Sequence, residues 1–230
     1  MRPLLLFGVL YVVFTEFVRF NEGIEHFPAL LLTGIVLFTF FADATSGAVT
    51  SVLDRENLVR KIQFPRLVVP LAVVTTALFN LAVNLLAVAV FVLVSGVDPR
   101  LTWLLLPIPM LVLVVFALGA AMLLSALYVR YRDMNPIWEV VLQILFYASP
   151  ILYTVEAIGN DTAREALMSN PLGAILQQTR HWLVGGDAQS AAAVIGGAER
   201  LLVPGGIVAG ALLLGFWYFR REAPRIAEEL

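Results

Sequence analysis

The chain has 230 residues, of which 60% are hydrophobic and 14% are charged, and its mean hydropathy is +0.88. A water-soluble fold of this size could not bury so much apolar surface, so the composition predicts an integral membrane protein. The net charge of −2 argues against a nucleic acid partner, and the absence of cysteine excludes disulfides, thiolate metal sites and cysteine nucleophiles.

Uncharged runs divide the chain into six candidate membrane-spanning helices, because a helix needs about 20 mostly apolar residues to cross the hydrocarbon core. We place them at about residues 3–20, 28–50, 67–97, 101–127, 136–154 and 201–219. The first run lacks the small-residue cleavage site of a signal peptide, so we count it as a retained span. The expected fold is an all-α integral membrane protein, with residues 1–230 forming a single transmembrane domain.

The basic residues orient these spans, since positively charged loops stay on the cytoplasmic side of the membrane. With the N-terminus inside, ten of the fifteen Arg and Lys residues fall in cytoplasmic segments and five fall outside. The sequence therefore predicts a multi-pass protein of the cytoplasmic membrane with both termini inside. The stretch "YVRYRDMNP" becomes a cytoplasmic turn, with Arg130, Arg132 and Asp133 at the headgroup level and Pro136 in the first turn of the next helix.

Two connections between the spans have helical patterns of their own. Inside, "SVLDRENLVRKIQFPR" mixes apolar and charged residues at helical spacing and predicts a short amphipathic helix that ends before Pro65. Outside, Thr162 and Glu165 have the spacing of a capping box, and "NPLGAILQQTRHWLVGG" predicts a second helix stopped by Gly185. We expect these external helices to be short and re-entrant, dipping into the outer membrane face with an apolar stripe of Leu172, Ile175, Leu176, Thr179, Trp182 and Leu183.

Polar residues inside the spans are costly and hence informative. The fifth span carries a face of Glu139, Gln143, Phe146, Pro150 and Tyr153, which would be about 20 Å long on a continuous helix. The third span carries Thr76, Asn80 and Asn84 at i, i+4 and i+8. Such residues either hydrogen-bond neighbouring helices or line a substrate path.

A substrate path would suit sugars, because aromatic rings stack weakly on pyranose rings and allow the substrate to leave. We predict that this path is lined by Phe38, Phe41, Glu139, Gln143, Phe146, Tyr147 and Tyr153. In the last span, Gly206 and Gly210 form a small-residue pair of the kind that marks close helix packing, which we expect within one subunit.

The chain lacks the residues for ATP hydrolysis. A P-loop needs a lysine behind a glycine-rich turn, and the only lysine is Lys61, in "LVRKIQ". We expect no catalytic residue and no metal site, since "NEGIEHF" is more simply a solvated surface. Any energy from ATP and Mg must then come from another subunit.

Three motifs together resemble the permease subunits of ABC type-2 exporters for O-antigen, teichoic acid, galactan and related polysaccharides. They are "NLVRKIQFPRLVVPL", "YVRYRDMNPIWEVVLQILFYASPILY" and "NPLGAILQQTRHWLVGG". The resemblance implies a homodimer of six-span subunits on separate ATPase subunits, passing a lipid-linked glycan outward. It also implies an interface helix ahead of the first span. The matching contact with the ATPase subunit would be made by a coupling helix with Asn57, Leu58, Arg60, Lys61 and Ile62.

Three other functions remain open at this point. An ABC type-2 exporter of drugs or other small hydrophobic molecules would share most of these motifs. An ion-driven secondary transporter would use Glu16, Asp43 and Glu139 as a proton relay and predicts internal repeats, which the sequence does not display. A membrane anchor without a transport role would leave the intramembrane polar face without purpose.

Overall fold

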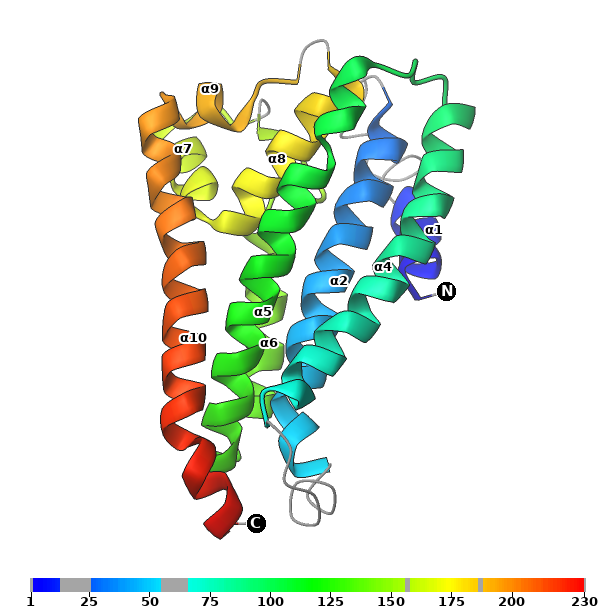
Figure 1. Ribbon diagram of the computed structural model, residues 1–230. Coiled ribbons are helices and arrows are strands. Elements are labelled where there is room, and N and C mark those ends of the chain that lie inside the picture. Colours follow the sequence, from blue (N-terminus) through cyan, green and yellow to red (C-terminus); the bar gives the residue numbers. More distant parts are fainter. Residues whose placement is uncertain (1, 13–25, 55–65, 156–157, 186–187, 230) are drawn as a thin grey trace.

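The computed structural model describes residues 2–12, 26–54, 66–155, 158–185 and 188–229, and every regular element in these residues is a helix. Four long helices form the body: α2 (Phe27–Asp54), α4 (Val68–Val94), α5 (Pro107–Arg130) and α10 (Leu202–Glu229) (Figure 1). Shorter helices surround them, namely α1 (Arg2–Val12), α6 (Met134–Tyr147), α7 (Asp161–Ser169), α8 (Pro171–Val184), α9 (Ala191–Ile195) and the 3-10 turns η2 (Leu101–Leu105) and η4 (Ala198–Leu201). The all-α class predicted from the sequence is confirmed for the described residues.

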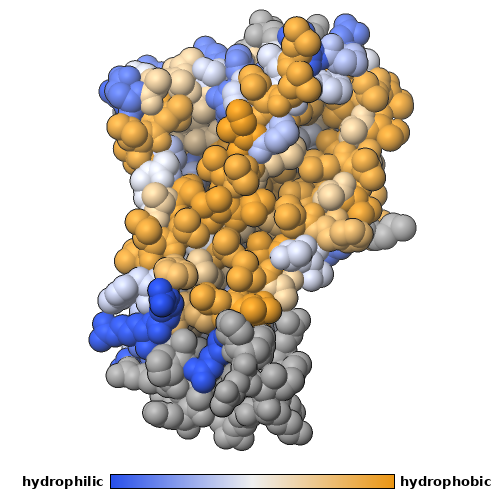
Figure 2. Space-filling model, viewed as in Figure 1, coloured by the Kyte–Doolittle hydropathy of each residue, from blue (hydrophilic) through white to orange (hydrophobic). Residues whose placement is uncertain are grey.

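Four helical stretches are long and apolar enough to cross a membrane, and they are Phe27–Asp54, Val68–Val94, Leu101–Arg130 and Ala198–Glu222. In Figure 2, apolar side chains cover the middle of the visible face, and hydrophilic ones gather towards its two ends. The other two predicted spans correspond to shorter helices among the described residues. The first is described as a helix only to Val12, and the fifth contains the 14-residue α6.

Helix α2 lies at the centre of the bundle. It packs against α1, α4, α5, α6 and α8, and its residues are buried on nearly every side. The sequence allows this because the helix is apolar all round, with a few hydroxyl groups that bond internally. Thr33 Oγ1 and Thr45 Oγ1 each donate to the carbonyl four residues earlier, at 2.7 Å, so neither hydroxyl is left unsatisfied in the core.

Helices α5 and α10 touch backbone to backbone at two glycines. A Cβ atom added to Gly119 would lie 2.5 Å from the backbone nitrogen of Leu212, and one added to Gly215 would strike the carbonyl oxygen of Gly119. By contrast, a Cβ atom at Gly206 or Gly210 would meet nothing within 4 Å. The expectation that Gly206 and Gly210 pack closely within the subunit is therefore wrong, and Gly119 with Gly215 forms the close seam.

Helix α6 ends earlier than the predicted span 136–154. Its last residue is Tyr147, and the chain continues without helix through Ser149 and Pro150. Proline lacks a backbone N–H and disfavours helical geometry at the residue before it, which explains the break. At 1.5 Å per residue α6 is about 21 Å long, shorter than the hydrocarbon core of about 30 Å.

The segment between α6 and α10 contains both helices predicted from the sequence. The N-cap of α7 is Asn160, whose side chain accepts from the backbone N–H groups of Thr162 and Ala163, so the predicted cap at Thr162 is two residues late. Helix α8 begins as predicted, with Asn170 as cap and Pro171 at its first position, and Gly185 ends it at a φ of 64°. Most of its apolar stripe is buried against the chain's own helices, whereas Trp182 is half-buried.

Candidate functional site

A groove lies between α1, α2 and α6 and contains about 1060 Å³. Leu5, Leu6 and Val9 of α1 form its apolar wall. Helices α2 and α6 supply the rest of the lining, which mixes aromatic, polar and acidic side chains: Phe38, Thr39, Ala42, Asp43, Ser46, Glu139, Leu142, Gln143, Phe146 and Tyr147. Among the described residues, this lining contains two carboxylates and no basic side chain.

Five of the seven residues predicted to form a substrate path line this groove. On α6, Glu139, Gln143 and Phe146 share one face, as the sequence spacing predicted, and Tyr147 lines the groove beside them. Phe38 reaches them from α2, and its ring meets that of Phe146 edge to face at a centroid distance of 5.1 Å. The rings of Phe146 and Tyr147 meet in the same way at 5.4 Å. The groove therefore has an aromatic cluster at the contact between α2 and α6.

The other two predicted path residues lie elsewhere. Phe41 is fully buried in the core, where its ring stacks on Phe116 of α5 at 5.0 Å and lies 6.4 Å from that of Trp138. Tyr153 follows the end of α6, so it does not continue the helical face, and its hydroxyl donates to the carbonyl of Tyr147. Leu142 was not among the predicted path residues, but it is buried and lines the groove.

The sequence prediction missed the polar face of α2. Thr39, Asp43 and Ser46 line the groove at i, i+4 and i+7, which is the spacing that identified the face of α6. Asp43 was considered for a proton relay but not for the path. On the opposite wall, Glu139 accepts a hydrogen bond from Asn135 at 3.2 Å, one turn earlier on α6. Two polar helical faces thus confront each other across the groove.

Side chains from the segment between α6 and α10 hold the backbone that follows α6. Arg180 of α8 is buried, and its guanidinium donates to the carbonyl groups of Tyr153 at 2.9 Å and Ile151 at 3.2 Å. Asn170 donates to Ser149 Oγ at 3.1 Å and to the carbonyl of Ala148 at 3.4 Å. These bonds replace the helical ones that Pro150 interrupts, so residues 148–153 have a fixed position without being helical.

The turn "YVRYRDMNP" joins α5 to α6, and all three of its charged residues are exposed. The guanidinium of Arg130 lies 5.5 Å from the ring of Tyr131, and that of Arg132 lies 5.6 Å from the ring of Tyr128. Asp133 precedes α6 without making a side-chain cap bond. Pro136 lies in the first turn of α6, as predicted. The end of α10 carries two more such pairs, Arg220 with Phe216 and Arg221 with Trp217.

The predicted coupling helix lies outside the described residues. This applies to its five candidate contact residues, Asn57, Leu58, Arg60, Lys61 and Ile62. Among the polar residues of the third span, Asn84 bonds to the carbonyl of Asn80 at 2.8 Å and Thr76 to that of Ala72 at 2.9 Å. These are bonds within α4, and neither residue lines the groove.

Comparison with known proteins identifies the family. The model of the ABC-2 type transporter family matches residues 1–181, which is most of the chain. The chain belongs to the ABC-2 type transporter family. The family expected from the three sequence motifs is thereby confirmed, and the matched range includes all the residues that line the groove.

Relatives of this ABC-2 family chain have names that specify an exported molecule. The chain is 29% identical over 177 residues to the O-antigen export system permease protein RfbA of Myxococcus xanthus, covering 76% of this chain and 67% of that protein. It is 26% identical over 187 residues to the protein of the same name from Klebsiella pneumoniae, covering 80% of this chain and 71% of that protein.

Proposed function

We propose that this chain is the transmembrane subunit of an ATP-driven exporter that moves a lipid-linked polysaccharide, of the O-antigen class, across the cytoplasmic membrane. The observation that carries the proposal is the groove of α1, α2 and α6, which combines aromatic rings with carboxylate, amide and hydroxyl groups. The names of the relatives support the substrate class.

The lining suits a long sugar chain in motion. Phe38, Phe146 and Tyr147 offer ring faces or edges to pyranose rings, while Asp43, Glu139 and Gln143 offer hydrogen bonds to sugar hydroxyl groups. Each contact is weak and none depends on the identity of one sugar, so successive units of the polymer bind and leave in turn. We expect a second copy of the chain to enclose the groove in a homodimer.

The energy would come from a separate ATPase subunit, because no P-loop occurs in the sequence. The loop between α2 and α4 is the expected contact, with Leu58 and Ile62 as its apolar part. We expect Leu58→Asp to abolish co-purification of the ATPase subunit and glycan export while the protein still inserts. Gln63→Asp adds the same charge in the same loop and is the control. If Leu58→Asp keeps both the ATPase subunit and export, the contact lies elsewhere.

We further propose that both termini face the cytoplasm. In Figure 1 the C-terminal ends of α2, α5 and α10 lie at the same end of the bundle, and "YVRYRDMNP" follows α5 there. Reporter fusions after Lys61, Asp133 and Glu222 should read as cytoplasmic, and those after Gly23, Pro99 and Asn160 as external. A cytoplasmic reading at Asn160 would overturn this topology.

The export function is tested by complementation of a strain that lacks its own polysaccharide permease. The double variant Gln143→Ala/Phe146→Ala removes one amide and one ring from the groove. We expect surface polysaccharide to fall on the order of tenfold, since two contacts of roughly 1 kcal/mol each are lost. Val140→Ala/Ile144→Ala changes exposed residues of the same helix outside the groove and should leave export unchanged. Equal loss from both pairs, at equal membrane levels, would contradict the proposal.

A further inference from the structure

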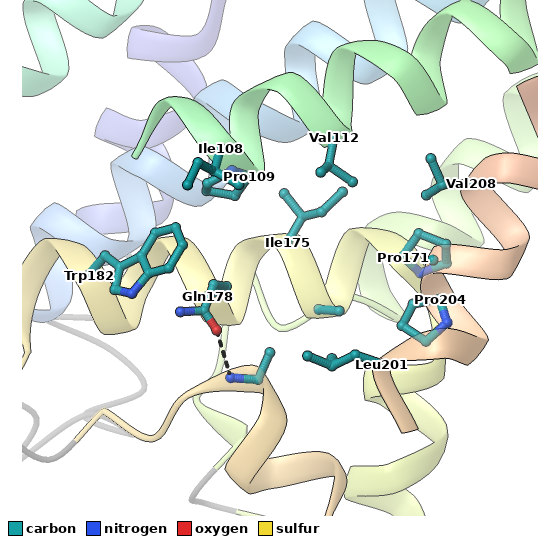
Figure 3. Close-up of a pocket in the computed structure, with 13 residues that line it drawn as sticks. Ile108, Pro109, Val112, Pro171, Ile175, Gln178, Trp182, Leu201, Pro204 and Val208 are labelled. Carbon is teal, nitrogen blue, oxygen red and sulfur yellow. Dashed lines mark hydrogen bonds between the residues drawn. The ribbon is translucent and has the colours of Figure 1, made fainter. Parts of the chain in front are cut away.

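A second hollow of about 220 Å³ lies between α5, α8 and α10, and it shares no residue with the groove. We call it the cleft. Figure 3 shows Ile108, Pro109 and Val112 of α5 and Pro204 and Val208 of α10 around it, with α8 between them. Ile175 and Trp182 project into it from α8 (Figure 3).

The cleft is lined almost wholly by hydrocarbon. Among the described residues, no charged side chain contributes to its lining, and the one amide is that of Gln178. The Oε1 atom of Gln178 accepts a hydrogen bond from the backbone N–H of Ala191 at 3.2 Å, so this acceptor is already used (Figure 3). The remaining polar groups of these side chains are the Nε2 amide of Gln178 and the indole N–H of Trp182. A polar ligand would therefore gain few hydrogen bonds for the hydration that it loses, which favours an apolar occupant.

The surroundings of the cleft show what covers it. Its two walls are the first turns of α5 and α10, both of which belong to membrane-spanning stretches. The flanking residues are apolar and exposed, with Leu111 at 65%, Leu202 at 76% and Ile207 at 45%. Because the bilayer surrounds these exposed apolar residues, lipid chains lie next to the cleft. Trp182 at one end is half-buried, as tryptophans in the interfacial belt are.

Size selects among apolar occupants. An α-helix is about 10 Å across with its side chains, so a helix from a second subunit is too wide for a hollow of this volume. A single hydrocarbon chain is narrow enough. We propose that the cleft binds one acyl chain of a membrane phospholipid, which fills the space between α5, α8 and α10. The proposal depends on membrane insertion alone and is independent of the exported substrate.

Gly205 provides a variant that blocks the cleft without a steric clash. It lines the cleft, and a Cβ atom on it would meet nothing within 4 Å. Gly206 is equally open but does not line the cleft, so it is the matched control. We expect Gly205→Leu to place its side chain where the acyl chain lies, and Gly206→Leu to project into bulk lipid.

The test counts the phospholipids that remain on the detergent-purified protein, by native mass spectrometry. We expect one retained phospholipid per chain in the wild type and in Gly206→Leu, and about tenfold lower occupancy in Gly205→Leu, the effect of displacing roughly two buried methylenes. Equal retention in all three proteins would overturn the proposal. So would displacement of the phospholipid by a polyprenyl phosphate added in equal amount, or a change of oligomeric state in Gly205→Leu without loss of lipid.

A second measurement follows the wild-type protein, and one conservative variant serves only to assign the signal. In bilayers of phospholipid with brominated chains, the fluorescence of Trp182 in the wild-type protein should be quenched. The fluorescence of Trp182 is the part of the total tryptophan fluorescence that is missing in Trp182→Phe. When unbrominated phospholipid is added, the fluorescence of Trp182 should recover only at a higher molar excess than the fluorescence of the exposed Trp217. Identical relief curves for the two tryptophans would mean that the cleft contains only exchanging bulk lipid, and the proposal would fail.

Discussion

The groove and the cleft are two hollows in one apolar chain, and their linings are opposite in character. In the groove, Glu139 and Gln143 of α6 face Asp43 and Ser46 of α2. In the cleft, the polar side chains among the described residues are Gln178, whose oxygen is already bonded, and the indole of Trp182. The difference follows from where the sequence interrupts its hydrophobic runs. Polar residues at helical spacing on two neighbouring helices give a hollow with a polar lining. Prolines and glycines among apolar neighbours give a hollow with an apolar lining.

The largest expected effect comes from the seam that holds the walls of the cleft together. Gly119→Val would push the backbone of α10 away from α5, and we expect a loss of about 3 kcal/mol or more in stability, enough to reduce folded protein severely. Thermal unfolding of the detergent-solubilised protein measures it. Gly210→Val is the control, since that position is open. Equal melting temperatures for the two variants would mean that the seam yields easily and that the cleft has no rigid wall.

A smaller effect should separate the two hollows at α8, which borders the cleft on one side and holds the chain after α6 on the other. Arg180→Leu removes the donor for the carbonyl groups of Ile151 and Tyr153, and we expect a loss of about 2 kcal/mol. Hydrogen exchange in residues 148–154 should rise, while phospholipid retention in the cleft stays unchanged.

Arg200→Leu is the comparison variant for Arg180→Leu. Arg200 is half-exposed in its ion pair with Glu165, so we expect a loss of well under about 1 kcal/mol. If Arg180→Leu also empties the cleft of lipid, α8 transmits changes between the two hollows and they are not independent.

The smallest expected effect concerns the contact between α2 and α6, next to the groove. Trp138 Nε1 donates to Thr45 Oγ1 at 3.0 Å, so Trp138→Phe should cost about 1 kcal/mol with little change in shape. In a Thr45→Ala background the same change should cost less, and the double-mutant cycle isolates the bond. A cycle with no coupling energy would show that ring packing alone joins α6 to α2.

The sequence predicted the elements that carry local signals. Helix α8 was predicted from its stretch "NPLGAILQQTRHWLVGG" and from the glycine that ends it, and the structure adds Asn170 as its cap. The polar face of α6 was found from its spacing as far as Phe146. The failure came at Pro150, which was treated as part of the face although proline interrupts a helix.

Other features depend on which helices meet, and local patterns do not contain that information. Phe38 and Phe41 lie one turn apart, yet one borders the groove and the other stacks on Phe116, because α2 is surrounded by helices on nearly every side. The spacing of Gly206 and Gly210 suggested a seam, but the seam is formed by Gly119 and Gly215, which are 96 positions apart in sequence. Only the packing of α5 on α10 brings those two together.

The bonds from Asn170 and Arg180 to residues 148–153 affect how this protein can be recombined with its relatives. Neither side of this contact is complete alone, since the backbone after α6 is bonded to side chains that lie 21 or more residues later in the chain. A chimera that exchanges the segment between α6 and α10 should therefore have its first crossover within α6, before Ala148, and its second after Val184. A crossover between Tyr153 and Asn170 would join a backbone from one parent to donors from another, and such hybrids should be recovered less often.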